Sequence, residues 1–146
     1  MILDIARPIR IAARLPEDLW PLAIEHAVYL LKRRPIQRLE WKTPLEILYG
    51  EKPHVGNMRI FGCKAYVRIS HIPRTEKLKP RAEAGYFVGY GASNIYYIWL
   101  PQRIPSRQET IIRARDITFN EDEFFDPTQP ISLLESKLLS SSDDIA

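Results

Sequence analysis

The chain has 146 residues, of which 45% are hydrophobic and 27% charged, values typical of one globular domain with a short extension. It contains no run of about 18 apolar residues, which excludes a transmembrane helix of ordinary length. The first 20 residues do not form a secretory signal, so we expect a nuclear or cytoplasmic protein without membrane contact. A single cysteine, Cys63, excludes an internal disulfide, and with only three histidines we expect no metal and no cofactor.

The charge is distributed unevenly along the chain. Residues 1–115 contain 20 Lys and Arg against 10 Asp and Glu, whereas residues 116–146 contain one Lys and eight acids. A basic body of this kind favours a polyanionic partner. Charge balance within the molecule is the alternative.

Helical patterns dominate the first 50 residues. Residues 1–16 are apolar and basic, but Pro8 interrupts them, so we predict the frayed end of a larger unit. Residues 17–34 carry one wide apolar stripe, with Pro21 at the first position of the main helix, and Pro35 ends them. The stripe requires a partner surface, and the helices can rest on the following strands.

Residues 43–50 carry the clearest local signal. Thr43, Pro44 and Glu46 form a capping box with proline at the first helical position. Gly50 suits a left-handed end of that short helix.

After Pro53 the pattern changes to alternation, which indicates strands at 59–70, 86–90, 95–100 and 109–119. The last pattern changes parity near Arg115 and Asp116, which indicates a bulge or two short strands. Four or five short antiparallel strands predict a small barrel. Residues 127–146 are predicted to be a disordered acidic tail. The residues expected to point into the barrel are Phe61, Cys63, Ala65, Val67, Phe87, Ile112, Ala114, Ile117 and Phe119.

Few residues suggest catalysis. Cys63 alternates with core residues and is interpreted as a small buried side chain rather than a nucleophile. His26 lies on the apolar helix face and is interpreted as a packed, hydrogen-bonded histidine rather than a base. Asp116 and the acids at 121–123 could form a metal site, but a solvated acidic surface is the preferred interpretation. No phosphate-binding glycine loop or hydrolase motif occurs.

Residues 59–81 hold seven Lys and Arg and one acid, Glu76. Tyr66 lies between Lys64 and Arg68 on the predicted outer strand face, and Arg113 and Arg115 share the outward parity. Cations with an interleaved aromatic ring suit a phosphate backbone and a stacked base. A solvated loop with an ordinary exposed strand is the alternative. The candidate nucleic-acid-binding residues are Lys64, Tyr66, Arg68, Arg74, Lys77, Lys79, Arg81, Arg113 and Arg115.

The segments LPEDLWPLAIEHAVYLLKRRP, KTPLEILYGEKPHVGNMRIFGCKAYV, KLKPRAEAGYFVGY, YYIWL and RARDITFNE follow one another in this order. In this combination the sequence resembles copia-type retrotransposon polyproteins, at the end of the integrase core and just after it. The resemblance covers residues 1–125. It implies an α+β fold: N-terminal helices, then a small antiparallel SH3-like β-barrel and a disordered C-terminal tail.

The resemblance further implies that residues 1–50 are the last helices of a truncated RNase H-like integrase core and residues 57–120 the SH3-like barrel. The catalytic Asp, Asp and Glu of the family lie upstream of the helix at 17–34. None of Asp4, Glu17, Asp18 and Glu25 matches them, so no enzyme activity is expected. We expect Met1 to begin a fragment of a longer polyprotein.

Three functions remain open. The first is a non-catalytic polyprotein fragment that binds nucleic acid without sequence preference or assists assembly. The second is an SH3-like module that binds a protein, and the third is a translated relic without function. The exposed apolar face of the N-terminal helices also suggests self-association.

Overall fold

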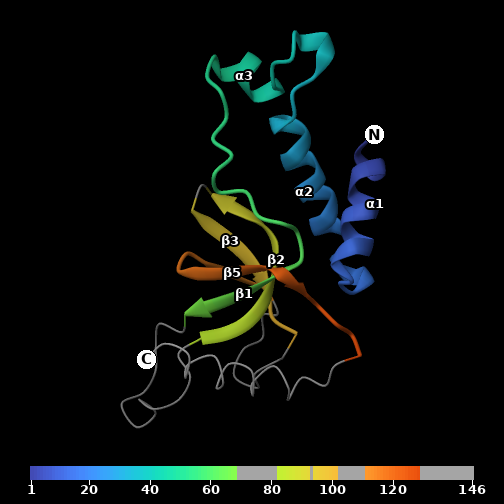
Figure 1. Cartoon of the computed structure of the whole chain (residues 1–146), viewed down its shortest axis with the longest axis vertical. Coiled ribbons are helices and arrows are strands. Elements are labelled where there is room, and N and C mark those ends of the chain that lie inside the picture. Colours follow the sequence, from blue (N-terminus) through green and yellow to red (C-terminus); the bar gives the residue numbers. More distant parts are fainter. Residues whose placement is uncertain (69–81, 93, 102–110, 129–146) are drawn as a thin grey trace.

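The computed structural model describes residues 1–68, 82–92, 94–101 and 111–128. Helices α1 (Ile2–Ala13) and α2 (Trp20–Arg33) lie side by side next to a curved antiparallel sheet, and the short α3 (Pro44–Tyr49) lies beyond the end of α2 (Figure 1). None of the helices in these ranges is long and apolar enough to cross a membrane. The predicted order of helices followed by strands is confirmed, and the predicted tail falls, from residue 129 onward, outside the described residues.

The prediction of a frayed segment before residue 16 was wrong, because α1 is a regular helix that continues through Pro8. Pro8 removes one backbone hydrogen bond, but its side is exposed, whereas Ala6 and Ala13 are buried. These small side chains allow α1 to pack closely on its neighbours. Most helix stability comes from such tertiary packing, which the local pattern around Pro8 does not contain.

The helix predicted at 17–34 is confirmed in its main part. Residues Glu17–Leu19 form a 3-10 turn, and α2 then begins at Trp20 with Pro21 in its first turn. The missing N–H of Pro21 needs no partner there. A second 3-10 turn, Gln37–Leu39, follows α2.

The capping box of α3 is confirmed. The backbone N–H of Glu46 donates to Thr43 Oγ1 at 3.1 Å. The helix ends at Gly50, whose φ of 76° is a conformation that glycine adopts without a steric penalty.

Five antiparallel strands form one sheet in the order β4-β3-β2-β1-β5. Strand β2 begins four residues before the predicted strand. These four residues contain no β-branched side chain and were therefore not predicted as strand, but they pair with β1, where Arg68 lies opposite Ala82. Strand β5 likewise continues past residue 120. The strands are β1 (Cys63–Arg68), β2 (Ala82–Ala92), β3 (Ile95–Trp99), β4 (Ile111–Ala114) and β5 (Ile117–Phe124).

The sheet is curled because its two edge strands are neighbours in the chain. Strands β4 and β5 are separated only by Arg115 and Asp116, yet β4 pairs with β3 and β5 pairs with β1. One bent segment therefore joins the two edges, as in a barrel. The parity change near Arg115 marks this bend, so of the two predicted alternatives the pair of short strands is confirmed.

The core inside the barrel contains the predicted inward side chains. Val67 is 6% exposed and lies opposite the partly buried Ile117 of β5. Phe61 is an exception, because it is buried outside the barrel, beneath the helices. The buried residues inside are Cys63, Ala65, Val67, Phe87, Tyr96, Ile98 and Leu100, with Ile112, Ala114, Ile117 and Phe119 packed against them.

A second core joins the helices to the outer face of the sheet. Tyr86 and Val88 of β2 contact it from the sheet, so β2 is buried on both faces. The helical residues of this core include Ala13, Leu19 and Ala23. The wide apolar stripe of α2 therefore has its partner surface, and the helices rest on the barrel as expected.

The contact between α1 and the barrel requires a glycine. Gly62 has a φ of 81°, and its N–H donates to the carbonyl oxygen of Phe87 at 2.7 Å. A Cβ atom at this position would lie 2.4 Å from the Cβ of Ala13. Any larger residue would therefore force α1 away from the sheet.

Candidate nucleic-acid interface

Lys64, Tyr66 and Arg68 alternate on β1 and point out of the barrel, but they differ in exposure. Arg68 is exposed and Tyr66 half-buried, whereas Lys64 is only 2% exposed. Lys64 lies opposite Tyr86 in the sheet, and Tyr86 packs against Phe125 at 5.3 Å between ring centroids. The outer face near Lys64 is therefore covered, so the prediction of an exposed Lys64 was wrong.

The buried ammonium group of Lys64 has a carboxylate partner. Lys64 Nζ donates to Glu123 Oε2 at 2.8 Å and lies 5.4 Å from the centre of the Tyr66 ring. Burial alone would lower the pKa of Lys64, but hydrogen bonds to Glu123 and Tyr66 outweigh it and raise that pKa above its ordinary value. Lys64 thus forms an ion pair within the fold, in which the ammonium group is buried and the Glu123 side chain is half-exposed, so Lys64 is not available to bind nucleic acid.

The exposed cations lie around the bend between β4 and β5. The backbone N–H of Arg68 donates to the carbonyl oxygen of Asp116 at 3.3 Å, which holds the end of β1 beside Arg115. Arg113 is exposed on β4, with its guanidinium 5.9 Å from the centre of the Tyr97 ring. We call Tyr66, Arg68, Arg113 and Arg115 the bend surface. The other predicted binding residues, Arg74, Lys77, Lys79 and Arg81, lie outside the described residues.

Two acids near the end of β5 pair with cations. Glu123 contacts Lys64, and a carboxylate oxygen of Glu121 lies 3.9 Å from Arg59 Nη1. Both side chains remain partly exposed to solvent, so the ion pairs add to the predicted solvated acidic surface and do not contradict it. In the part of the chain that the structure describes, no three His, Cys, Asp or Glu side chains are grouped as a metal site requires.

Cys63 and His26 are packing residues. Cys63 is fully buried, and burial raises the pKa of its thiol to about 12, so the reactive thiolate is not populated at neutral pH. His26 is 4% exposed and stacks on Tyr90 at 5.5 Å between ring centroids. Its packing is as predicted, but Nδ1 has no hydrogen-bond partner among the described residues.

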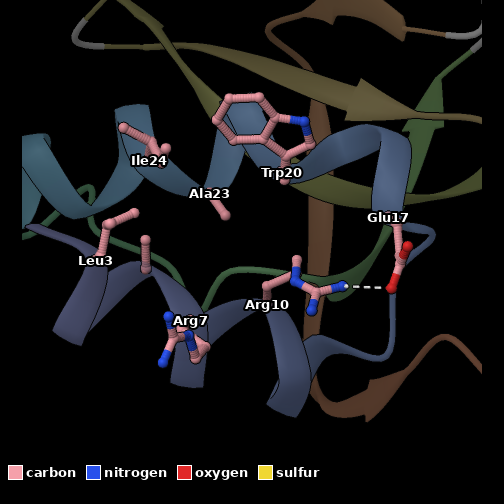
Figure 2. A pocket seen from close by; sticks show the side chains of 8 residues that line it. Leu3, Arg7, Arg10, Glu17, Trp20, Ala23 and Ile24 are labelled. Atoms are coloured by element: carbon pink, nitrogen blue, oxygen red, sulfur yellow. Dashed lines mark ion pairs between the residues drawn. The ribbon is translucent and has the colours of Figure 1, made fainter.

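A groove between α1 and α2 was not predicted as a site. Its volume is about 300 Å³, and Figure 2 shows Trp20 and Ile24 of α2 along one side and Leu3 and two arginines of α1 along the other. Arg10 Nη1 lies 3.7 Å from Glu17 Oε1 at one end. The apolar residues of segment 1–16 are visible in the sequence, but the sequence pattern does not show that this segment packs against α2 to form a groove. The lining residues are Leu3, Ala6, Arg7, Arg10, Glu17, Trp20, Ala23 and Ile24.

The five-stranded barrel agrees with a known domain family. Residues 63–133 match the family described as the retroviral polymerase SH3-like domain. The chain carries a retroviral polymerase SH3-like domain. The match begins at the first residue of β1 and includes all five strands of the SH3-like domain.

The similarity to curated proteins is broader than the SH3-like domain. The chain is 30% identical over 112 residues to a retrovirus-related Pol polyprotein from transposon TNT 1-94 of Nicotiana tabacum, covering 76% of the chain and 8% of that protein. It is 32% identical over 112 residues to the Pol polyprotein from transposon RE1 of Arabidopsis thaliana, covering 77% and 7%. Residues 63–146 are too few to hold 112 aligned residues, so the likeness includes part of the helical region.

The predicted resemblance to copia-type retrotransposon polyproteins is confirmed by these relatives, and the chain corresponds to a small part of their length. An uncharacterized mitochondrial protein of Arabidopsis thaliana is 29% identical over 84 residues, covering 58% of the chain and 67% of that protein. No solved structure matches the chain.

Proposed function

We propose that this part of a retrotransposon Pol polyprotein is a non-catalytic module that binds nucleic acid without sequence preference through the bend surface. The observation that carries the proposal is the contact of Arg68 with the backbone of Asp116, which brings exposed cations of β1 and of the bend together. Phosphate contacts by such cations release counterions and need no particular base sequence. The half-buried ring of Tyr66 lies on the same strand and offers a stacking face.

Double reversal of charge at Arg68 and Arg115, to Glu at both positions, is expected to weaken binding of a labelled oligonucleotide at least tenfold at low salt. The logarithmic salt slope should also fall by about two ions. The control is the double change of Arg14 and Lys52 to Glu, which alters the net charge equally at exposed sites elsewhere. With magnesium present, the oligonucleotide should be recovered uncut.

The bend surface fails as a binding site if the wild-type protein binds no oligonucleotide at low salt. It also fails if both double variants lose the same affinity, because net charge alone would then explain the loss. Lys64 is left unchanged in this experiment because Lys64→Glu would place a second carboxylate at a buried position beside Glu123 and unfold the domain.

We also propose that the groove between α1 and α2 receives a second copy of the chain. Leu3 and Trp20 at this groove are 58% and 57% exposed (Figure 2). Asp4 lies near the start of α1 and the cations Arg7 and Arg10 lie further along it. A two-fold arrangement of antiparallel α1 helices would place Asp4 of each copy near the cations of the other.

The average mass in sedimentation equilibrium is expected to rise with concentration for the wild-type protein and to stay monomeric for Leu3→Glu. Leu48→Glu, at a 70% exposed position on α3, should behave like the wild type. A monomeric wild type at all concentrations would exclude self-association. Association of Leu3→Glu equal to the wild type would exclude this groove as the contact.

A further inference from the structure

The segment between α2 and α3 is a small closed loop. Ile36 and Lys42 form an isolated antiparallel bridge, in which the Ile36 N–H donates to the carbonyl oxygen of Lys42 at 3.1 Å. The Trp41 N–H donates back to the carbonyl oxygen of Ile36 at 3.1 Å. These two hydrogen bonds join the first and last residues of the loop and fix the backbone at Trp41.

The loop contains two successive residues in the left-handed backbone region. Glu40 has a φ of 55° and Trp41 a φ of 63°. This region is unfavourable for residues with a Cβ atom and unusual for a bulky one. The loop geometry therefore imposes strain at Trp41, where a glycine would fit without cost.

This strained residue presents its side chain to solvent. The Trp41 side chain is 69% exposed, so the indole gains little from packing within the chain. Figure 1 shows the loop at the end of the molecule remote from the sheet, so it is separate from the bend surface. An exposed indole on a loop that is closed by backbone hydrogen bonds is available for contact with another molecule.

The charged residues of this segment indicate the chemical class of ligand that would suit the indole. Arg34, Arg38 and Lys42 are exposed and lie before, within and at the end of the loop, against the single acid Glu40. Exposed cations that precede and follow an exposed aromatic residue in the chain match the alternation of phosphates and bases in an unpaired strand.

We propose that the loop at residues 36–42 is a binding site for single-stranded nucleic acid, with Trp41 stacked on a base and Arg34, Arg38 and Lys42 at the flanking phosphates. The site shares with the proposed function of the bend surface only the chemical class of its ligand. An unpaired strand is required because the base faces of a duplex are already stacked on one another.

The test is the binding of a labelled oligothymidylate of about 20 nucleotides to Trp41→Gly at low salt. Loss of one stacked base predicts roughly a tenfold fall in affinity. The same variant should unfold at an equal or higher urea concentration than the wild type, because glycine adopts the backbone conformation of residue 41 freely. A loss of binding in a protein that is no less stable separates contact from folding.

Three further proteins complete the experiment. Trp41→Phe keeps an aromatic face and should recover most of the affinity. Tyr49→Ala removes a similarly exposed aromatic ring from the end of α3 and should bind like the wild type. The Arg68 and Arg115 double variant reports on the bend surface independently, and a duplex of equal length should bind Trp41→Gly and the wild type alike.

The proposal is overturned if Trp41→Gly binds the oligothymidylate as the wild type does, which is also the result expected if the loop docks a peptide. An equal loss of duplex binding overturns base stacking. If the Arg68 and Arg115 double variant binds normally while Trp41→Gly is weakened, the loop site stands and the bend surface fails. The opposite pattern leaves the bend surface and removes the loop site.

Discussion

Val67→Asp is expected to unfold the SH3-like domain. Val67 is 6% exposed inside the barrel, between β2 and the partly buried Ile117 of β5. The core residues around it are apolar or aromatic, and Glu83 lies directly opposite Val67 on β2, so the new carboxylate would be buried next to a like charge. An uncompensated buried charge costs several kcal/mol, which is a large part of the stability of a small domain.

Thr118→Asp provides the matched control for this prediction. Thr118 is exposed on β5, directly after Ile117, and should tolerate the same side chain with a change of about 0.5 kcal/mol or less. Circular dichroism and urea denaturation at neutral pH measure both variants. A folded Val67→Asp with a midpoint close to that of Thr118→Asp would contradict the assignment of the inner face of β1.

The barrel could be predicted from sequence because its signals are local. Alternation places Cys63, Ala65 and Val67 on one face of β1, and the parity change at Arg115 locates the bend that joins the sheet edges. The capping box at Thr43 is equally local, since three residues define the start of α3. Such patterns describe how a segment folds before its neighbours are known.

The candidate site could be predicted only in part because exposure depends on neighbours. Alternation correctly places Lys64 outside the barrel, but the outer face there is covered through Tyr86 and Phe125, and Glu123 pairs with the ammonium group. The same parity at Arg68 leads to an exposed side chain, because it lies at the bend. One pattern therefore produced a buried structural cation and a surface cation.

The helix α1 shows the same limit for backbone structure. Pro8 alone predicts an interruption of the helix. The burial of Ala6 and Ala13 depends on contacts with α2 and Gly62, which no local pattern contains. The strain at Trp41 likewise has no sequence signal, because an ordinary residue occupies a conformation that glycine prefers.

The stability of the protein is expected to fall steeply on acidification because of His26. The ring lies between Phe61 at 5.2 Å, Phe87 at 5.9 Å and Tyr90 at 5.5 Å, measured between ring centroids. Burial among these rings lowers the pKa of His26 from 6.5 to about 4. The folded state therefore holds the neutral ring, whereas the unfolded chain accepts a proton near pH 6.5.

The sign of the effect follows from this difference in pKa. The stability that His26 contributes is complete above its unfolded pKa and is lost as the pH falls from about 6.5 towards 4, because the unfolded state then binds more protons. The loss between about pH 7.5 and about pH 4.5 should be roughly 2–3 kcal/mol from this residue. Urea denaturation at these two pH values measures it.

His26→Phe separates this contribution from every other pH-dependent contribution to stability. Phenylalanine keeps an aromatic ring in the cluster but cannot accept a proton, so the variant should lose roughly 2–3 kcal/mol less than the wild type over the same range. His54→Gln, at an exposed position, should retain the full pH dependence. Equal pH dependence in the wild type and His26→Phe would contradict the prediction, because it would show that the pKa of the buried ring is not lowered in the folded state.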